Sequence, residues 1–209
     1  MTHSDPSGHM SNDALNDALL KYIKENDASK LSQSIILSTG NSDQGRYLAF
    51  HQIAQVVAAK KIHEQFGTNV TLEFTLQEKH FLFGTTNWYV DIVSSDNQIW
   101  EVKPRRETPL SGYDGYTQDA EKQLIRYQSL NSNFVRGAVL ESIEGIPIVK
   151  DLKMDIEFLD SGKILYEFTV GNRSYLPSEA EDYVELYGGY PIDWMDIAKD
   201  VVTKSGKKK

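Results

Sequence analysis

The stretch that decides the fold is YVDIVSSDNQIWEVKP, residues 89–104. Two runs of apolar residues flank a polar segment, and this pattern predicts two antiparallel strands joined by a tight turn. Side chains alternate between the two faces of a strand, so Glu101 and Lys103 point to one side and Val102 to the other. Because Asp91 lies on the first strand, the hairpin carries two acids and one amine on neighbouring strands.

The length of the turn determines whether the two acids can meet. A two-residue turn pairs Asp91 with Val102 and places the acids on opposite faces of the hairpin. A three-residue loop, residues 95–97, pairs Asp91 with Glu101, and its last residue, Asn97, then takes the left-handed conformation at the bulge position. We predict the three-residue loop, or a bulge that has the same effect.

Two carboxylates and an ammonium on a buried hairpin cost free energy unless a cation offsets their charge. Oxygen ligands of this kind suit Mg²⁺ or Mn²⁺, and such an ion can activate water for attack on a phosphodiester. The spacing Asp-x9-Glu-x-Lys at residues 91–103 resembles that of the PD-(D/E)XK, or restriction-endonuclease-like, nuclease superfamily. The resemblance implies an α/β (α+β) fold in which helices flank a mixed β-sheet core.

The resemblance also implies a role for each residue of the hairpin. Asp91, Glu101 and the main-chain carbonyl of Val102 would hold Mg²⁺, with Mn²⁺ as the other suitable ion. Lys103 would orient or deprotonate the attacking water and stabilise the charge on the phosphate.

A second motif lies in AEKQLIRYQ, residues 120–128, on the helix expected after the Glu-x-Lys strand. Gln123 and Tyr127 are four residues apart and therefore lie on one helical face. The Gln-Leu-x-x-Tyr pattern resembles the nuclease domains of bacterial polymorphic toxins. It implies that Gln123 points towards the catalytic cluster and that Tyr127 contacts the nucleic acid. The alternative is a partly buried Gln that satisfies a backbone group, with the Tyr in the core.

The pattern of residues 46–65 is typical of a helix that ends at Gly67. Families of the superfamily often place a Glu on this first core helix, but here no acid precedes Glu64. We expect His51 to substitute, with Arg46 as a phosphate contact. A lone His on a helix is otherwise a core or surface group, and the departure leaves open whether one or two metal ions bind.

Basic residues close to the expected metal site are candidates for phosphate contacts. Arg105 and Arg106 follow the Glu-x-Lys strand directly and form a local basic lip.

The remaining patterns divide the chain into segments around this core. Residues 1–10 are expected to be a tag or disordered lead, 11–45 an N-terminal helical segment, 46–140 the nuclease core, 141–203 a C-terminal β-hairpin and helices of the same domain, and 204–209 a disordered basic tail. Further helices are expected at 11–26, 117–131, 178–186 and 192–202, strands at 70–76, 81–83, 134–140, 154–159 and 164–170, and either a strand or a helix at 34–38.

Composition limits the class of protein. The net charge of −8 argues against a plain nucleic-acid binder, and 14 of the 30 acidic residues lie between positions 139 and 200. We expect this acidic segment to lie away from the cleft, in a surface for a partner protein. The absence of cysteine excludes disulfides, cysteine-based zinc sites and thiol catalysis. No apolar run approaches the 18 residues of a membrane span, and no signal peptide is visible.

Together the residues and the resemblance predict a metal-dependent nuclease. By family analogy its substrate is DNA, with RNA not excluded, and its site of action is the cytoplasm. The toxin-like motif favours the toxic domain of an effector secreted into a target cell and neutralised by a cognate immunity protein. The alternatives are a cytoplasmic defence or DNA-repair nuclease, and a catalytically inert nuclease fold retained as a binding module.

Overall fold

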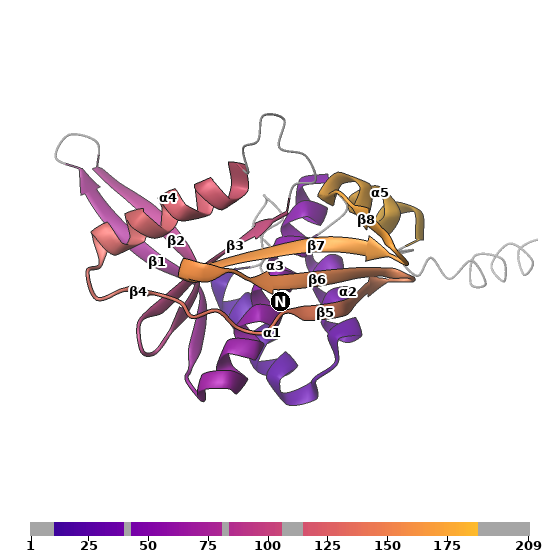
Figure 1. Cartoon of the computed structure of the whole chain (residues 1–209), viewed down its shortest axis with the longest axis horizontal. Helices are drawn as coiled ribbons and strands as arrows, with labels where there is room; N and C mark the ends of the chain where they lie inside the picture. The colour runs from indigo at the N-terminus through magenta and orange to yellow at the C-terminus, as the bar shows by residue number, and fades with distance from the viewer. Residues whose placement is uncertain (1–10, 40–42, 81–83, 106–114, 188–209) are drawn as a thin grey trace, which may run out of the picture.

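The computed structural model describes residues 11–39, 43–80, 84–105 and 115–187, without the side chains of residues 43–47, 80 and 115–118 (Figure 1). These residues form a mostly antiparallel mixed β-sheet flanked by helices, as the expected α/β (α+β) class requires. No helix among them is long and apolar enough to cross a lipid bilayer.

The sheet has eight strands in the order β1-β2-β3-β7-β6-β5, with β4 beside β3 and β8 beside β7. The long β1–β2 hairpin and the shorter β2–β3 hairpin are antiparallel, whereas β3 pairs in parallel with β7 and with β4. The strands are β1 Val70–His80, β2 Gly84–Ser94, β3 Gln98–Pro104, β4 Val135–Arg136, β5 Ile143–Val149, β6 Leu152–Phe158, β7 Lys163–Val170 and β8 Arg173–Tyr175; η1, Asp160–Gly162, is a short 3-10 turn between β6 and β7.

Helices cover both faces of β3. On one face, Trp100 and Val102 lie in the main core together with apolar residues of α1 and α3. On the other face, Ile99 packs with Leu124 and Tyr127 of α4. The helices are α1 Asn12–Glu25, α2 Ala28–Thr39, α3 Asp43–Phe66, α4 Gly115–Leu130 and α5 Pro177–Tyr187. The buried β3 strand therefore holds its charged residues between α3 and α4.

Several predicted elements are confirmed, and others need correction. The side chain of Ser11 caps α1 by accepting from the amide of Ala14, and the ambiguous segment 34–38 lies within α2. The first predicted strand extends to His80. Neither β5 nor β8 was predicted, and in β5 the residues Gly145 and Pro147 obscure the alternation that marks a strand. The elements predicted at 81–83 and 192–202, and the terminal segments 1–10 and 204–209, lie outside the described residues.

The strand predicted at 134–140 shrinks to the two residues of β4, because the indole of Trp100 lies against the backbone that follows. The amide of Gly137 donates to the carbonyl of Ile99, and the Trp100 indole N–H donates to the carbonyl of Ala138 at 3.1 Å. A Cβ atom at Gly137 would lie 2.0 Å from the Trp100 ring. The backbone at residue 137 therefore lies so close to the buried Trp100 ring that only glycine fits there.

We expect Gly137→Ala to lower the free energy of unfolding by about 2 kcal/mol, since the fully buried Trp100 ring has to move to admit a methyl group. Urea denaturation measures the change. Val139→Ala, at a site 57% exposed and two residues away, is the control and should change the unfolding free energy by less than about 0.5 kcal/mol. Equal stability of the two variants would contradict this account of β4.

Candidate metal centre

The β2–β3 hairpin has the predicted three-residue loop. The ladder pairs Ile92 with Trp100 and Val93 with Ile99, and Asn97 has φ 65° in the left-handed region. The amide of Asn97 donates to the carbonyl of Ser94 at 2.9 Å, which closes the turn. Continued by one residue, the same register brings Asp91 level with Glu101, as expected from the sequence.

The Asp91 carboxylate lies between β2 and β3, beyond the last paired residues of the ladder. Its Oδ2 accepts the backbone N–H of Val102 at 2.7 Å, and its Oδ1 accepts from the side-chain amide of Gln55 at 3.0 Å. Nε2 of His51 lies 3.3 Å from the same Oδ1. Burial opposes ionisation, but His51, Lys103 and the Val102 N–H together hold the pKa of Asp91 below its ordinary value. The buried side chain is therefore a carboxylate.

Glu73 is a third acid at this position, and the sequence did not point to it. It lies in the middle of β1 with φ 53°, a left-handed conformation that is uncommon for a residue with a side chain. Gln55 donates to its Oε1 at 2.5 Å, so one amide bridges Glu73 and Asp91. Single ligand atoms of His51, Glu73 and Asp91 all lie within 4.8 Å of one another. This set could hold a metal ion.

Two asparagines of α1 hold β1 where it turns. Asn12 donates to the carbonyl of Glu73 at 2.8 Å, while Asn16 accepts from the amide of Leu72 and donates to its carbonyl. The strand changes neighbours at the same place, because Leu72 packs in the main core and Leu76 packs against α4. Helix α1 thus fixes the backbone at Glu73. In this conformation the Glu73 side chain points towards Asp91, although strand alternation would place it on the solvent-facing side.

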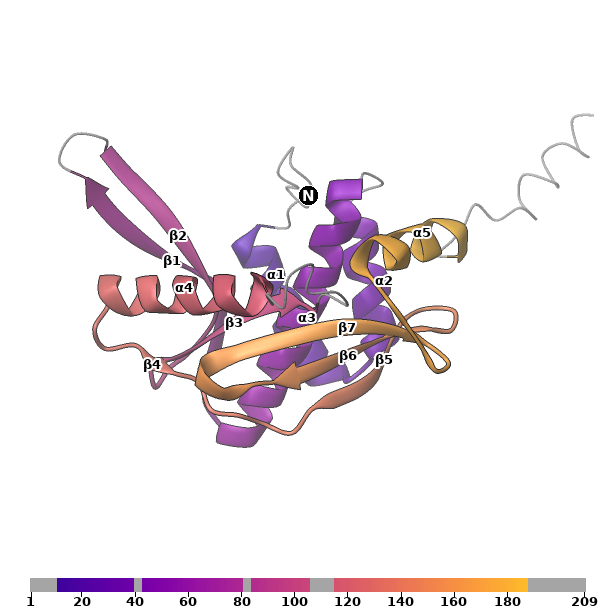
Figure 2. The same ribbon diagram turned by 45° about the horizontal axis from the view of Figure 1, so that its top comes forward.

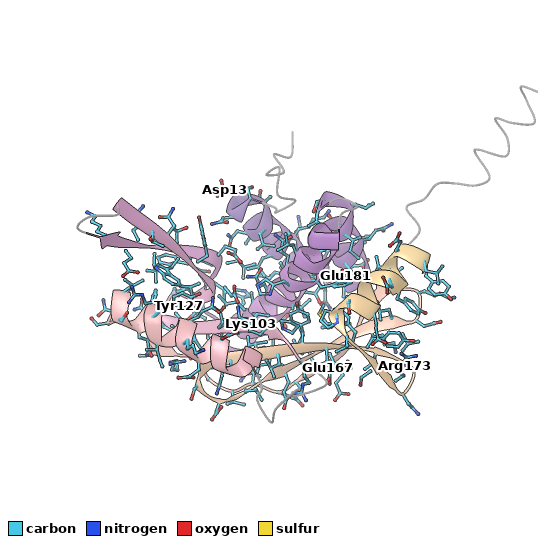
Figure 3. All side chains as sticks on the ribbon, turned by 90° about the horizontal axis from the view of Figure 1, so that it is seen from above. Asp13, Lys103, Tyr127, Glu167, Arg173 and Glu181 are labelled. Atoms are coloured by element: carbon cyan, nitrogen blue, oxygen red, sulfur yellow. The ribbon has the colours of Figure 1, made fainter. Side chains whose placement is uncertain are left out.

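Glu101 and Lys103 form an ion pair beside these acids. Nζ of Lys103 donates to Oε1 of Glu101 at 2.5 Å, with the Glu101 side chain 1% exposed and the Lys103 side chain 19% exposed. The other oxygen, Oε2, is buried and has no hydrogen-bond partner among the described residues. Burial, followed by the charge of Asp91, raises the pKa of Glu101 well above its ordinary value. Figure 3 shows Lys103 where β3, α3 and α4 come together.

Tyr127 on α4 is part of the core. It is 1% exposed, and its hydroxyl donates to the main-chain carbonyl of Tyr89 at 2.6 Å. Burial, followed by the charge of Glu101, raises the pKa of Tyr127, so the phenol stays protonated. The predicted contact of Tyr127 with nucleic acid is therefore replaced by the core position that the sequence left open. The residue ties α4 to β2 behind the acids.

Gln123 lies one helical turn before Tyr127 on the same face of α4. Its Oε1 is buried and has no hydrogen-bond partner among the described residues. A buried amide oxygen without a hydrogen-bond donor costs free energy. Its burial therefore favours a hydrogen bond to a group that the described residues do not supply. Its catalytic role stays a prediction.

The predicted basic lip is only partly described. The guanidinium of Arg105 pairs with Glu157 of β6 and lies 3.6 Å from Glu167 of β7. With Glu144 and Asp155 these residues line a cavity of about 210 Å³. Glu157 and Glu167 belong to the acidic segment that is predicted to lie away from the cleft, and because β7 pairs directly with β3, these two residues lie beside Arg105 at the end of the Glu-x-Lys strand. Acids compensate the charge of Arg105 and weaken its case as a phosphate contact. Arg106 and the side chain of Arg46 lie outside the described residues.

The pKa of Glu101 leads to a prediction about the metal-free protein. In the unfolded chain Glu101 titrates near its ordinary value of about 4.3, whereas in the fold its pKa is higher. The folded state then holds this proton more tightly, so the ionised group costs stability above the raised pKa, and that cost disappears as the pH falls towards about 4.3. We expect Glu101→Gln to raise the melting temperature at pH 8 by about 3 °C and to change it little at pH 4.5.

Thermal unfolding in the presence of a chelator measures this difference between the two proteins. Glu25→Gln, at an exposed position on α1, is the matched control and should leave the melting temperature unchanged at both pH values. A lower melting temperature for Glu101→Gln at pH 8 would mean that the pair with Lys103 already compensates the buried charge.

Comparison of the chain with protein-family models, with curated proteins and with solved structures finds no match. The chemistry of the site therefore has to be argued from its geometry. The structure brings Asp91, Glu101, Lys103 and His51 together as expected and adds Glu73 with its bridging Gln55.

Proposed function

We propose that this chain is a metal-dependent nuclease that hydrolyses phosphodiester bonds in DNA. The observation that carries the proposal is the cluster of three carboxylates, the buried Asp91 and Glu101 and the half-buried Glu73, with one ammonium, Lys103, against it. Burial, followed by the charge of Asp91, raises the pKa of both Glu73 and Glu101. Such a cluster is stable at neutral pH if a cation offsets its negative charge.

The donor set favours a hard divalent ion. Carboxylate oxygens are the preferred ligands of Mg²⁺ and Mn²⁺, and the orphaned Oε2 of Glu101 is an acceptor of this type. We propose that Glu73, Asp91 and Glu101 hold the ion, with the carbonyl of Val102 as a further ligand and His51 beside them. When bound, the ion supplies an activated water and stabilises negative charge on a phosphate.

The other residues of the site orient the reacting groups. The Lys103 ammonium is fixed by Glu101 and partly exposed, so it can contact both a water and a phosphate oxygen at the cluster. The side-chain amide of Gln55 donates to both Glu73 and Asp91 and so orients the two carboxylates, and Gln123 offers a buried amide from the α4 side. Preorganised groups of this kind lower the barrier because they need not rearrange during the reaction.

We further propose that the fold is restriction-endonuclease-like. Supporting this, the acids lie on adjacent strands β2 and β3, the Glu-x-Lys strand is central, and α3 and α4 cover its two faces. The Gln-Leu-x-x-Tyr segment lies on α4 as in the toxin nucleases that the chain resembles. On this resemblance rests the proposed role as the toxic domain of a secreted effector that acts in the cytoplasm of a target cell.

Cleavage of supercoiled plasmid in Mg²⁺ tests the activity. We expect the intact protein to nick or linearise the plasmid and Lys103→Ala to do so at least 100-fold more slowly, since general acid–base groups contribute about 10²–10⁴-fold. Lys24→Ala, at an exposed position on α1, is the control and should cleave at the wild-type rate. Absence of cleavage by the wild-type protein would favour an inert binding module, and equal cleavage by all three would place the site elsewhere.

Expression in a bacterial host tests the biological role. A toxin should arrest growth, Glu101→Ala should abolish the arrest, and a neighbouring open reading frame that encodes an immunity protein should restore growth. An active nuclease that leaves the host unharmed would instead favour a defence or repair enzyme.

A further inference from the structure

The β1–β2 hairpin continues beyond the body of the protein as a two-stranded arm, defined here as residues 75–80 and 84–89 (Figure 2). Its strands remain in one antiparallel register from the Thr75–Tyr89 pair to the His80–Gly84 pair. Helix α4 crosses the arm in the view of Figure 1, and in Figure 2 the arm slants away from α4 towards its tip.

The face towards α4 holds the arm in position. The indole N–H of Trp88 donates to Oε2 of Glu78 at 2.9 Å, across the two strands. Arg126 of α4 pairs with the same Glu78, and its guanidinium lies 5.6 Å from the centre of the Trp88 ring. Leu76 packs with Val90 in the core beneath α4. These contacts give the arm a fixed orientation relative to the acids at its base.

The opposite face of the arm is exposed and carries no acid. Its side chains are directly opposed in three pairs, each with a hydroxyl or amide group: Thr75 with Tyr89, Gln77 with Asn87, and Lys79 with Thr85. These residue types are the ones that contact phosphates, sugars and base edges in protein–DNA interfaces. In a chain with net charge −8, a face of this length without Asp or Glu is compatible with a polyanion.

The arm begins beside the proposed metal centre. Glu73 is two residues before Thr75 on β1, and Asp91 is two residues after Tyr89 on β2, so both acids lie at the base of the arm. At about 3.3 Å per residue, Lys79 lies roughly 20 Å from Glu73. That length corresponds to about six base pairs of duplex at 3.4 Å each. A phosphodiester at the cluster therefore has neighbouring nucleotides alongside the arm.

We propose that the exposed face of the arm is a groove-binding element for duplex DNA, an inference that rests on the nuclease function proposed above. A two-stranded β-ribbon fits the major groove. Lys79, at the far end, contacts a phosphate, and the opposed amides of Gln77 and Asn87 face the base edges. Asn and Gln are the side chains that pair with adenine there, so the arm also provides a means of base preference.

Duplex binding by matched variants tests the arm. Fluorescence anisotropy of a labelled 24-base-pair duplex is measured with the full chain carrying Asp91→Asn, so that cleavage does not interfere. Asn87→Asp adds one charge at constant size and is expected to weaken binding at least tenfold. Asn172→Asp adds the same charge on the exposed β7–β8 turn and should not weaken it. Lys79→Gln should lower the slope of log affinity against log salt by about 0.9, and Lys24→Gln should leave the slope unchanged.

Hydrolysis of bis(p-nitrophenyl) phosphate separates the arm from the metal centre. In the otherwise wild-type chain, Asn87→Asp should reduce plasmid cleavage while leaving hydrolysis of this small diester unchanged. If the arm variants bind and cleave duplex like the wild type, the arm proposal is overturned and the nuclease stands. If the wild type cleaves neither substrate, the nuclease proposal fails. The binding measurements then decide by themselves whether the arm binds duplex DNA. An equal loss of binding to a single-stranded 24-mer would also overturn the proposed place in the groove.

Discussion

Replacing Glu73 with Gln is expected to lower the rate of DNA cleavage in Mg²⁺ by about 10³-fold, roughly 4 kcal/mol in activation free energy. The substitution removes the charge of one of the three carboxylates that are proposed to hold the ion, the half-buried Glu73. It keeps an oxygen that can accept the hydrogen bond from Gln55, so the backbone at this position has no reason to change. The rate of plasmid nicking at saturating Mg²⁺ measures the effect.

Glu141→Gln removes the same charge from a residue whose side chain is 89% exposed, far along the chain from the cluster. It should cleave at the wild-type rate. Wild-type activity of Glu73→Gln, with normal Mg²⁺ dependence, would show that Glu73 is a neighbour of the metal centre and not a ligand.

Two substitutions at Asp91 should separate its chemical and structural roles. Asp91→Asn keeps an oxygen for the Val102 N–H but removes the charge, so we expect a folded protein with at least a 10³-fold lower cleavage rate. Asp91→Ala also leaves the buried N–H of Val102 without an acceptor. This loss should lower the free energy of unfolding by about a further 2 kcal/mol.

Urea denaturation of the two Asp91 variants, next to the plasmid assay, measures both effects. The lowered pKa of Asp91 means that its carboxylate stabilises the fold at neutral pH and that this contribution is lost as the pH falls through the lowered pKa. The stability gap between the wild type and Asp91→Asn should therefore narrow in acid. A gap that is the same at pH 7 and at low pH would contradict the role given to this charge.

The hairpin was the part of the site that the sequence could predict. The parity of Asp91, Glu101 and Lys103 follows from strand alternation, and Asn97 is a residue type that tolerates the left-handed conformation. These are local properties of one short segment. Strand alternation and the turn residue set the register of the hairpin and bring Asp91, Glu101 and Lys103 together without any long-range contact.

Glu73 could not be found in this way, because its place depends on contacts between distant segments. Alternation along β1 puts it on the apparently solvent-facing side. Its turn towards Asp91 depends on a left-handed backbone that Asn12 and Asn16 hold from more than 50 residues away. The approach of the acidic strands β6 and β7 to Arg105 has the same origin, since parallel pairing of β3 with β7 leaves no local signal.

Diffraction at the manganese absorption edge from crystals grown with Mn²⁺ tests most directly whether the cluster holds a divalent ion. The predicted result is one anomalous peak with oxygens of Glu73, Asp91 and Glu101 within about 2.5 Å, absent from crystals of Asp91→Asn. Crystals of the wild-type protein that show no peak among these three side chains at millimolar Mn²⁺ would contradict the proposed metal centre and the nuclease with it.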